Sequence, residues 1–445
     1  MRAEATARAQ ASEPELSRER LRQFYKYAGR VFDLDALLGS IEDTRQCSKI
    51  STSLVVRIIF LLGLLRIRSF NALEPRLARP QLQRALGLKV TQNKACSVDT
   101  LAYALDRTKI ETARMAMVKA VRKAERNKVF RSGGAGGLRF VAIDGWEPFS
   151  SYERCCPGCL TRQVTVGKKK EKVTQFYHAF VVALLLGERE EIVLEYEPIL
   201  SADARKERGQ SNVEGHEGEL TAAKRLVRRL RTTYGKWLEV LVVDALYANG
   251  PFFTVAKQCG FSVIATLKKE TDEPLKDALA IWQGQPPKEV IELKDGGRIE
   301  RWDCKEITTL LTYDGPMRVV REIIHRGDAQ STWCWAVTGR AATLLTTDSI
   351  SKAGHSRWHL ENTGFYQFAN YWRFSHVFRH TDTALRALFY IFFLAFNLLQ
   401  LFVYRHVGGY GRDRGKDPTR TIWSLVDEML GDVERLSEPL AWNSG

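Results

Sequence analysis

The chain has 445 residues, of which 67 are Lys or Arg and 52 are Asp or Glu, and its net charge is +15 at a pI near 9.4. Hydrophobic residues make up 44% of it, which excludes an intrinsically disordered protein, and the length exceeds one average domain. The positive charge favours a polyanionic partner, either nucleic acid or an anionic membrane surface.

Residues 1–132 predict a helical region. The first residues, MRAEATARAQASEPE, lack the apolar core of a signal peptide, which predicts a cytoplasmic location. Ser97–Leu105 has an N-cap residue and then apolar positions at helical spacing, typical of a DNA-recognition helix or of an ordinary bundle helix. Thr112–Arg131 carries seven basic residues against one Glu. This segment predicts a helix whose basic face is either solvated surface or a phosphate-contact face.

The glycine-rich segment Gly133–Gly137 (GGAGG) predicts a linker, beyond which the pattern changes. Apolar runs predict strands at 138–143, 176–186, 191–200, 237–243 and 261–267, and helical spacing predicts helices at 217–234 and 251–258. This order predicts a mixed α/β sheet over 138–268. The first strand ends at Asp144 and the fourth at Asp244, where open α/β sheets tend to build functional sites.

The C-terminal third predicts a return from strands to helices. Residues 269–345 predict a β-rich insertion, with a hairpin turn at Asp295–Gly297. Residues 346–405 predict a second, helical part of the core, and 406–445 a tail with a short helix. Within the core, Ala387–Val403 is apolar but shorter than the ~20 residues of a membrane span. We therefore expect a buried helix and no membrane partner.

Three acidic residues are candidate ligands of divalent metal ions. Asp144 and Asp244 each follow a buried strand, where an unpaired charge is costly, although either alone is compatible with a capping role. Glu361 lies four residues after Arg357 in an aromatic-rich segment, so the two share a face of a predicted buried helix. Phosphodiester cleavage needs an activated water or hydroxyl and a stabilised leaving oxygen. Two divalent cations held by carboxylates supply both.

These motifs resemble those of the DDE transposases of bacterial insertion sequences, in particular the insertion-sequence-four group. The matching segments are VAIDGW at 141–146, VVDALYANGPF at 242–252 and RWHLENTGF at 357–365. Over residues 140–405 the resemblance implies an RNase H-like catalytic domain with a β-rich insertion, in which Asp144, Asp244 and Glu361 bind two Mg²⁺ or Mn²⁺ ions. It also implies a prokaryotic, nucleoid-associated homodimer on paired ends, which cleaves and joins double-stranded DNA at terminal inverted repeats and at a target.

The segment around Glu361 departs from the family signature Y-x2-R-x3-E-x6-K. Arg357 and Glu361 match it, but Gly354 stands at the Tyr position and Phe368 at the Lys position. Because all three acidic positions are present, we favour an active enzyme. The alternatives are a transposase descendant that only binds DNA and, from the apolar segment alone, a membrane protein.

The DNA contacts of the site are also predicted from this resemblance. Arg357 is expected to orient Glu361 or to contact a DNA phosphate, and Asn362 is expected to contact DNA. Arg373 or His376, with Arg379 as a further alternative, is expected to supply the phosphate contact of the missing Lys. The chain has no P-loop or dinucleotide fingerprint, so no nucleotide is expected.

A cysteine cluster, Cys155-Cys156-Pro157-Gly158-Cys159, contains a C-x-x-C turn of the kind that forms half of a zinc site. His178 lies 19 positions after Cys159, and the sequence has no second C-x-x-C. Eight cysteines in 445 residues do not make a disulfide framework. We favour reduced thiols in a basic loop, with a structural zinc ion as the alternative.

Overall fold

The computed structural model describes residues 20–130, 135–167, 170–187, 190–210, 215–268, 272–308, 310, 312–358, 360–407 and 422–442, without the side chains of Glu361, Asn362, Thr363 and Trp423. Contacts divide the chain into two units. The first holds Met1–Val129, Glu153–Cys156 and Gln367–Gly445, and the second holds Phe130–Tyr152 and Pro157–Tyr366. The five segments expected from the sequence stay a prediction about domains.

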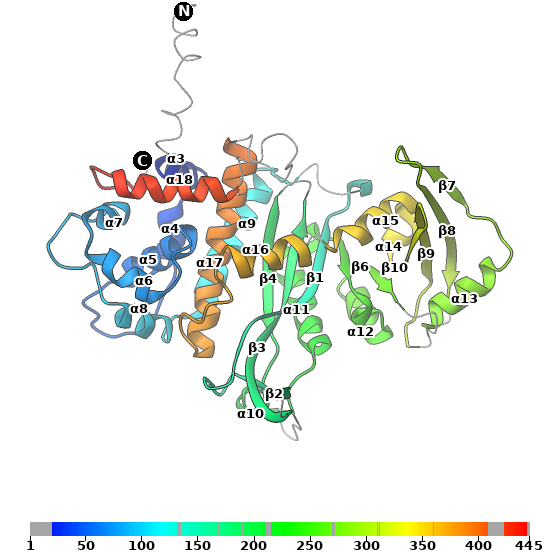
Figure 1. The fold of residues 1–445 in the computed structure, drawn as a ribbon, viewed down its shortest axis with the longest axis horizontal. Coiled ribbons are helices and arrows are strands. Elements are labelled where there is room, and N and C mark those ends of the chain that lie inside the picture. Colours follow the sequence, from blue (N-terminus) through cyan, green and yellow to red (C-terminus); the bar gives the residue numbers. More distant parts are fainter. Residues whose placement is uncertain are drawn as a thin grey trace, which may run out of the picture. The chain divides into compact units, whose positions relative to one another are not determined.

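The described residues of the first unit are mainly helical (Figure 1). Its helices are α3 (Arg20–Phe32), α4 (Leu34–Gly39), α5 (Thr52–Leu64), α6 (Phe70–Leu73), α7 (Pro80–Ala85), α8 (Val98–Leu105), α9 (Ile110–Arg126), α17 (Asp382–Phe402) and α18 (Ile422–Arg435), with a 3-10 helix at Glu74–Ala78 and a π-helix at Val403–Val407. Ser97 caps α8, because its side chain accepts a hydrogen bond from the amide of Thr100.

The apolar helix α17 packs against α5, α8 and α9. By length and composition Asp382–Val407 could cross a membrane, but 94% of its most apolar window is buried inside the structure. Such burial is typical of a core helix, because a lipid-facing helix would present its apolar side chains outward. The predicted buried helix is confirmed.

Helix α9 is amphipathic, as the sequence predicts. Its alanines and valines are buried, while Lys119, Lys123 and Arg126 are exposed.

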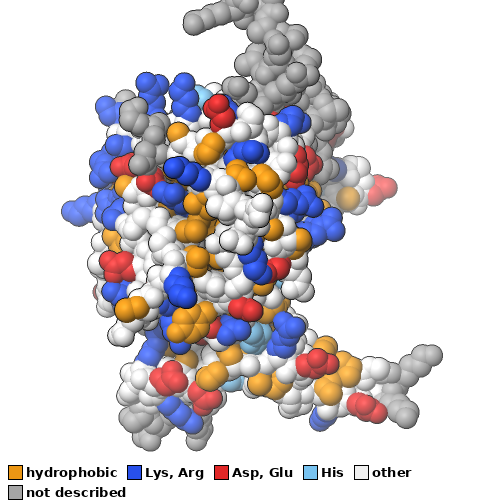
Figure 2. Space-filling view, turned by 90° about the vertical axis from the view of Figure 1, so that its left-hand side faces the viewer, with side chains coloured by type: hydrophobic (Ala, Val, Ile, Leu, Met, Phe, Trp, Pro, Cys, Tyr) orange, Lys and Arg blue, Asp and Glu red, His pale blue; other side chains and the backbone are white. Residues whose placement is uncertain are grey.

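Figure 2 shows the face that carries α6, α7 and α8, where Lys and Arg side chains are spread more widely than Asp and Glu. The net positive charge therefore reaches the surface, where it can act on a polyanion.

Ten strands of the described residues of the second unit form one sheet. They are β1 (Phe140–Ser151), β2 (Leu160–Val166), β3 (Glu171–Leu186), β4 (Glu191–Pro198), β5 (Val240–Val243), β6 (Ser262–Leu267), β7 (Glu289–Glu292), β8 (Arg298–Ile307), β9 (Met317–Arg326) and β10 (Ala329–Thr338). The strand order is β2-β3-β1-β5-β6-β10-β9-β8-β7, with β4 also paired to β3. Strands β1, β5 and β6 pair in parallel and β1 pairs with β3 antiparallel. The predicted mixed α/β class is confirmed.

Helices of the second unit cover this sheet. They are α10 (Ala202–Glu207), α11 (Glu219–Tyr234), α12 (Gly250–Gln258), α13 (Glu273–Trp282), α14 (Arg340–Leu344) and α15 (Thr347–Ser356), with 3-10 helices at Ala135–Gly137, Gly235–Trp237 and Ala245–Tyr247. Helix α11 packs on β3 and β4, and α15 packs on β5, β6, β9 and β10. The core between α15 and the sheet includes Trp335, Ile264 and Ile350, each at most 1% exposed.

Two local predictions about the first strands are wrong. Strand β1 does not end at Asp144 but runs on to Ser151, because β3 continues to pair with it and Asp144 lies opposite Val182. The supposed basic loop after β1 contains strand β2, which pairs with β3. Strand β2 was missed because most of its side chains are polar and exposed, so it lacks an apolar run.

The predicted β-rich insertion forms the far half of the same sheet (Figure 1). Its last strand, β10, pairs antiparallel with β6 of the core, and β9, β8 and β7 follow in order. The predicted hairpin joins β7 to β8, closed by a 2.8 Å hydrogen bond from the amide of Leu293 to the carbonyl of Gly297. The insertion is therefore continuous with the core through backbone hydrogen bonds.

The single helix predicted around Glu361 is three elements. Helix α15 ends at Ser356, a π-helix spans Leu360–Phe365, and α16 spans Tyr366–Asn370. Arg357 is the C-cap residue of α15, so it does not lie one regular α-helical turn before Glu361. Single π-helical turns inside helices often occur at functional sites.

Candidate active site

Asp144 and Asp244 follow paired residues of adjacent parallel strands. The β1–β5 register ends with Ile143 opposite Val243, so the next residue on each strand is one of the two aspartates. Strands β1 and β5 are buried up to this point, whereas both aspartates are partly exposed. The fold therefore places both carboxylates side by side, where the parallel pairing of β1 and β5 ends, as the sequence predicts.

Each aspartate is also oriented by its own backbone. Asp144 Oδ1 accepts a hydrogen bond of 2.9 Å from the amide of Gly145. Asp244 Oδ1 accepts one of 2.8 Å from the amide of Leu246, which caps the following 3-10 helix. Asp244 Oδ2 lies 4.0 Å from Nζ of Lys268. In both aspartates a backbone amide therefore binds Oδ1, and Oδ2 is left to interact with other groups.

Arg357 forms an ion pair with Asp144. Its Nη1 donates a hydrogen bond of 2.7 Å to Asp144 Oδ2, and the two side chains are 6% and 13% exposed. The pair expected between Arg357 and Glu361 lies outside the described side chains, and the contact that the structure describes joins the C-cap residue of α15 to β1. Charge-assisted bonds of this kind are among the stronger hydrogen bonds in proteins. Arg357 therefore fixes the second oxygen of Asp144.

A fourth carboxylate, that of Glu219, lies against the same strand. Glu219 is the first residue of α11, and a Cβ added at Gly145 would lie 2.6 Å from its carboxyl carbon. Residue 145 must therefore lack a side chain for Glu219 to reach the backbone beside Asp144. Tyr247, which follows Asp244, donates a 2.6 Å hydrogen bond to Glu219 Oε1.

Sequence reasoning missed Glu219. Acidic residues are common in the first turn of any helix because they complement its dipole, so its position carried no signal. The signal that was present is Gly145, a glycine inside a strand directly after a candidate catalytic aspartate. Such a glycine often marks the close approach of another group.

Burial and neighbouring negative charges raise the pKa values of Glu219 and Tyr247. Burial raises the pKa of Glu219, and the negative charge of Asp244 raises it further, while the bond from Tyr247 lowers it. Burial also raises the pKa of Tyr247 well above its ordinary value, followed by the charges of Glu219, Asp144 and Asp244. Three carboxylates therefore act on one phenol, which keeps its proton and serves as a donor.

Glu361 and Asn362 lie in the π-helix, but their side chains are outside the described residues. The segment itself is located by Phe365, whose ring stacks on that of Trp146 at a centroid distance of 6.1 Å. Trp146 lies two residues after Asp144 on β1. The backbone that carries Glu361 is therefore packed against the strand that carries Asp144.

The two departures from the family signature have structural causes. A Cβ at Gly354 would lie 2.7 Å from Cδ1 of Trp335, so the indole occupies the space that a tyrosine would need. Phe368 is fully buried, and its ring packs against Phe374, Phe393 and Phe396 of the first unit. A lysine at position 368 would bury an unpaired charge there.

The alternatives proposed for that lysine all belong to the first unit. Burial lowers the pKa of His376, and the positive charges of Arg154 and Arg373 lower it further. Arg373 has a left-handed backbone with φ 57°. Arg379 forms a 2.6 Å ion pair with Asp106. Arg379 therefore has a structural partner, and its assignment as a phosphate ligand stays the weakest of the three.

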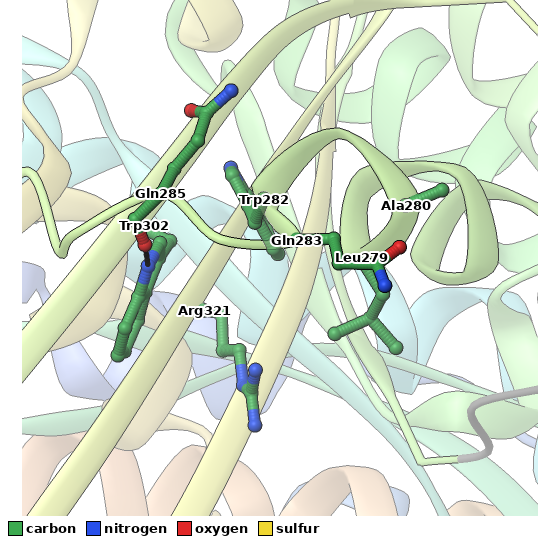
Figure 3. A pocket seen from close by; sticks show the side chains of 7 residues that line it. All are labelled: Leu279, Ala280, Trp282, Gln283, Gln285, Trp302 and Arg321. Carbon is green, nitrogen blue, oxygen red and sulfur yellow. Dashed lines mark hydrogen bonds between the residues drawn. The ribbon is translucent and has the colours of Figure 1, made fainter.

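Two neighbouring hollows lie in the second unit, of about 370 and 310 Å³. Figure 3 shows the first, where Arg321 of β9 and Trp302 of β8 face the end of α13, and Trp302 Nε1 donates to the carbonyl of Gln285. The second shares Leu279 and Arg321 with the first and is also lined by Lys268 and Trp333. Because Lys268 lies beside Asp244, the hollows lead away from the carboxylate cluster.

Comparison of the sequence with protein-family models and with curated proteins finds no match. The carboxylate cluster of the second unit is therefore interpreted from its own chemistry and from the motif resemblance.

Proposed function

We propose that the chain is a DDE-type DNA transposase, which cleaves and joins DNA strands with divalent metal ions. The observation that carries the proposal is the pairing of Ile143 with Val243, because it makes Asp144 and Asp244 neighbours where the parallel pairing of β1 and β5 ends. The mixed sheet, with an acidic residue within β1 and another directly after β5, is compatible with an RNase H-like core. The resemblance adds Glu361 as the third acid and a cytoplasmic, nucleoid-associated location.

The residues present suit Mg²⁺ or Mn²⁺. Asp144, Asp244 and Glu361 would hold the two ions, with Glu219 as a further oxygen ligand, and hard cations prefer such oxygen donors. Burial and, after it, the negative charge of Asp244 raise the pKa of Glu219, and a bound divalent cation would favour the charged carboxylate. When bound, the ions supply an activated water or 3′-hydroxyl and neutralise charge on the phosphodiester.

The surrounding side chains have roles that follow from their contacts. Arg357 holds Asp144 in one orientation through the 2.7 Å ion pair. Tyr247 orients Glu219 by donating a hydrogen bond to its Oε1. Lys268, which is exposed, adds a positive charge beside Asp244 where a phosphate would approach. Catalysis then rests on positioning and charge neutralisation, without a covalent protein intermediate.

A nucleic-acid partner, in the proposal double-stranded DNA, is supported by cations interleaved with aromatic rings. The hollows that lead from Lys268 are lined by Arg321, Trp302 and Trp333, a combination that suits a nucleic-acid strand. The exposed basic face of α9 suits phosphates of terminal inverted repeats. A homodimer on paired ends and a separate target DNA complete the proposal.

A transposase-derived protein that only binds DNA is the second candidate. The observation that favours it is the ion pair itself, because Arg357 already neutralises Asp144. In the proposed enzyme Asp144 would hold a metal ion in addition to its ion pair with Arg357. In the binding protein the guanidinium replaces the metal.

The deciding experiment measures metal-dependent cleavage of the terminal inverted repeats of the insertion sequence that encodes the protein. The DNA flanking the coding sequence, searched for short inverted repeats, supplies the substrate. We expect the protein to nick this DNA with Mg²⁺ and not with a chelator, and the Glu361→Gln variant to bind the same DNA without nicking it. Unchanged cleavage by Glu361→Gln would refute the assignment of Glu361. Binding without cleavage by the unaltered protein would favour the second candidate.

Glu219→Gln tests the fourth carboxylate. The amide keeps the shape of the side chain and can still accept the hydrogen bond of Tyr247, but it removes one negative charge from the cluster. We expect the Mg²⁺ concentration for half-maximal cleavage to rise about 10–100-fold. The matched control is Glu273→Gln, an exposed first-turn glutamate of α13. An unchanged Mg²⁺ requirement in Glu219→Gln would exclude Glu219 from metal binding.

A further inference from the structure

Cys159 and His178 meet across the β2–β3 ladder. Leu160 pairs with Tyr177, so the preceding residue on one strand and the following residue on the other lie opposite each other. Cys159 Sγ is 3.5 Å from His178 Nε2, and the two residues are 5% and 3% exposed. A thiol and an imidazole nitrogen are thus buried side by side at a point fixed by backbone pairing.

This separation matches two ligands of one zinc ion. Zinc binds sulfur at about 2.3 Å and imidazole nitrogen at about 2.0–2.1 Å, so two ligands at a tetrahedral angle lie roughly 3.5 Å apart. A hydrogen-bonded thiol can have the same separation. The choice between the two depends on whether further ligands are at hand.

The sequence supplies a further ligand next to Cys159. Cys156-Pro157-Gly158-Cys159 has the two-residue spacing that lets both thiolates of a C-x-x-C turn bind one ion. We propose that Cys156, Cys159 and His178 bind a structural zinc ion. A histidine from strand β3, 19 positions after Cys159, adds a third ligand to this half-site, where a second C-x-x-C is absent from the sequence.

The zinc site is separate from the carboxylate cluster. His178 lies opposite Phe149, five residues along β1 from Asp144. The zinc site offers thiolate sulfur and imidazole nitrogen, whereas the cluster offers hard carboxylate oxygens, so the two sites select different ions. The zinc ion would fasten the β1–β2 connection to β3, the strand that also pairs with Asp144. The inference is independent of whether the protein cuts DNA.

Metal analysis of the full-length protein tests this site. After expression in zinc-supplemented medium and extensive dialysis, we expect about one zinc per chain by elemental analysis. Cys159→Ser and Cys156→Ser should lose it, and the matched control Cys155→Ser, an exposed neighbouring cysteine, should keep it. Protein without zinc, or unchanged zinc in Cys159→Ser, would overturn the proposal.

Cobalt substitution keeps the test decisive if a serine variant fails to fold. The unaltered protein reconstituted with Co²⁺ should have thiolate-to-cobalt charge-transfer absorption and tetrahedral d–d bands. His178→Cys replaces the imidazole ligand by a thiolate. This variant should retain the metal and have stronger thiolate-to-cobalt charge-transfer absorption. Octahedral spectra without thiolate bands would show that these cysteines do not bind the ion.

Discussion

Asp244→Asn is expected to reduce Mg²⁺-dependent DNA cleavage by at least ~10²–10³-fold, the loss typical of removing one essential electrostatic group. The fold should survive, because asparagine Oδ1 can still accept the hydrogen bond from the amide of Leu246. Thermal unfolding and DNA affinity, measured beside cleavage, should be close to those of the unaltered protein. The change therefore separates metal binding from structure.

Asp144→Asn provides the contrast to this variant. It should lose cleavage to the same extent, but it also removes a counter-charge from Arg357, whose side chain is 6% exposed. Hydrogen bonds to charged groups contribute about 1.5–3 kcal/mol, so we expect a stability loss of that size. Equal stability of the two variants would contradict the structural role assigned to the ion pair.

Asp244→Cys identifies the role of the carboxylate as metal ligation. A thiolate binds Mn²⁺ better than Mg²⁺, because Mg²⁺ requires hard oxygen ligands. We expect the cysteine variant to cleave DNA with Mn²⁺ and to fail with Mg²⁺. Failure with both ions, in a variant that still binds DNA, would mean that Asp244 acts in another way than as a ligand.

Asp303→Asn is expected to destabilise the second unit by about 3–5 kcal/mol, as does the loss of one partner from a buried ion pair. The side chain of Asp303 is fully buried and accepts two 2.8 Å hydrogen bonds from Arg318, with further hydrogen bonds from Lys288 and Thr347. Arg318, 5% exposed, would lose its counter-charge. The midpoint of urea unfolding measures the loss.

The control for this variant is Asp295→Asn in the β7–β8 turn. Its ion pair with Arg326 is exposed, with side chains 58% and 68% accessible, so its removal should change stability by less than ~1 kcal/mol. Similar losses in the two variants would mean that the buried pair contributes no more than a surface one.

The same carboxylates predict a loss of stability in acid. Burial raises the pKa of Asp303, but bonds from Arg318 and Lys288 outweigh it and bring the pKa to about 2. Glu322 also has a pKa of about 2, because bonds from His355, Ser351 and Arg301 outweigh its burial. Both values lie below the ordinary 3.8 and 4.5, so this stability is complete above about pH 4.5 and disappears as the pH falls toward 2. The free energy of unfolding of Asp303→Asn should therefore fall less steeply between pH 4.5 and 2 than that of the unaltered protein.

The sequence predicted those elements whose signal is local. Apolar runs marked β1, β5 and β6, and the helical period marked α11 and α12, since burial on one or both faces dictates composition. The positions of Asp144 and Asp244 followed from these strands. Strand β2 has no such run, and it forms only because β3 extends far enough to pair with it.

The parts of the site that were missed depend on contacts between distant segments. Nothing near Arg357 in the sequence indicates that it reaches Asp144, 213 positions earlier. Glu219 resembles any first-turn glutamate until the fold places its carboxylate beside Gly145 of β1. His178 was noted but could not be joined to Cys159 while the intervening strand was taken for a loop.

The pairing of β6 with β10 means that the insertion cannot be removed without consequence for the rest of the sheet. Deleting β7–β10 would leave one side of β6 with unsatisfied amide and carbonyl groups, a template for association with other chains. An ancestral or engineered form lacking these strands would need another strand, a helix or a partner subunit in their place. Minimised versions of this protein should therefore keep at least β10, even where the outer strands are dispensable.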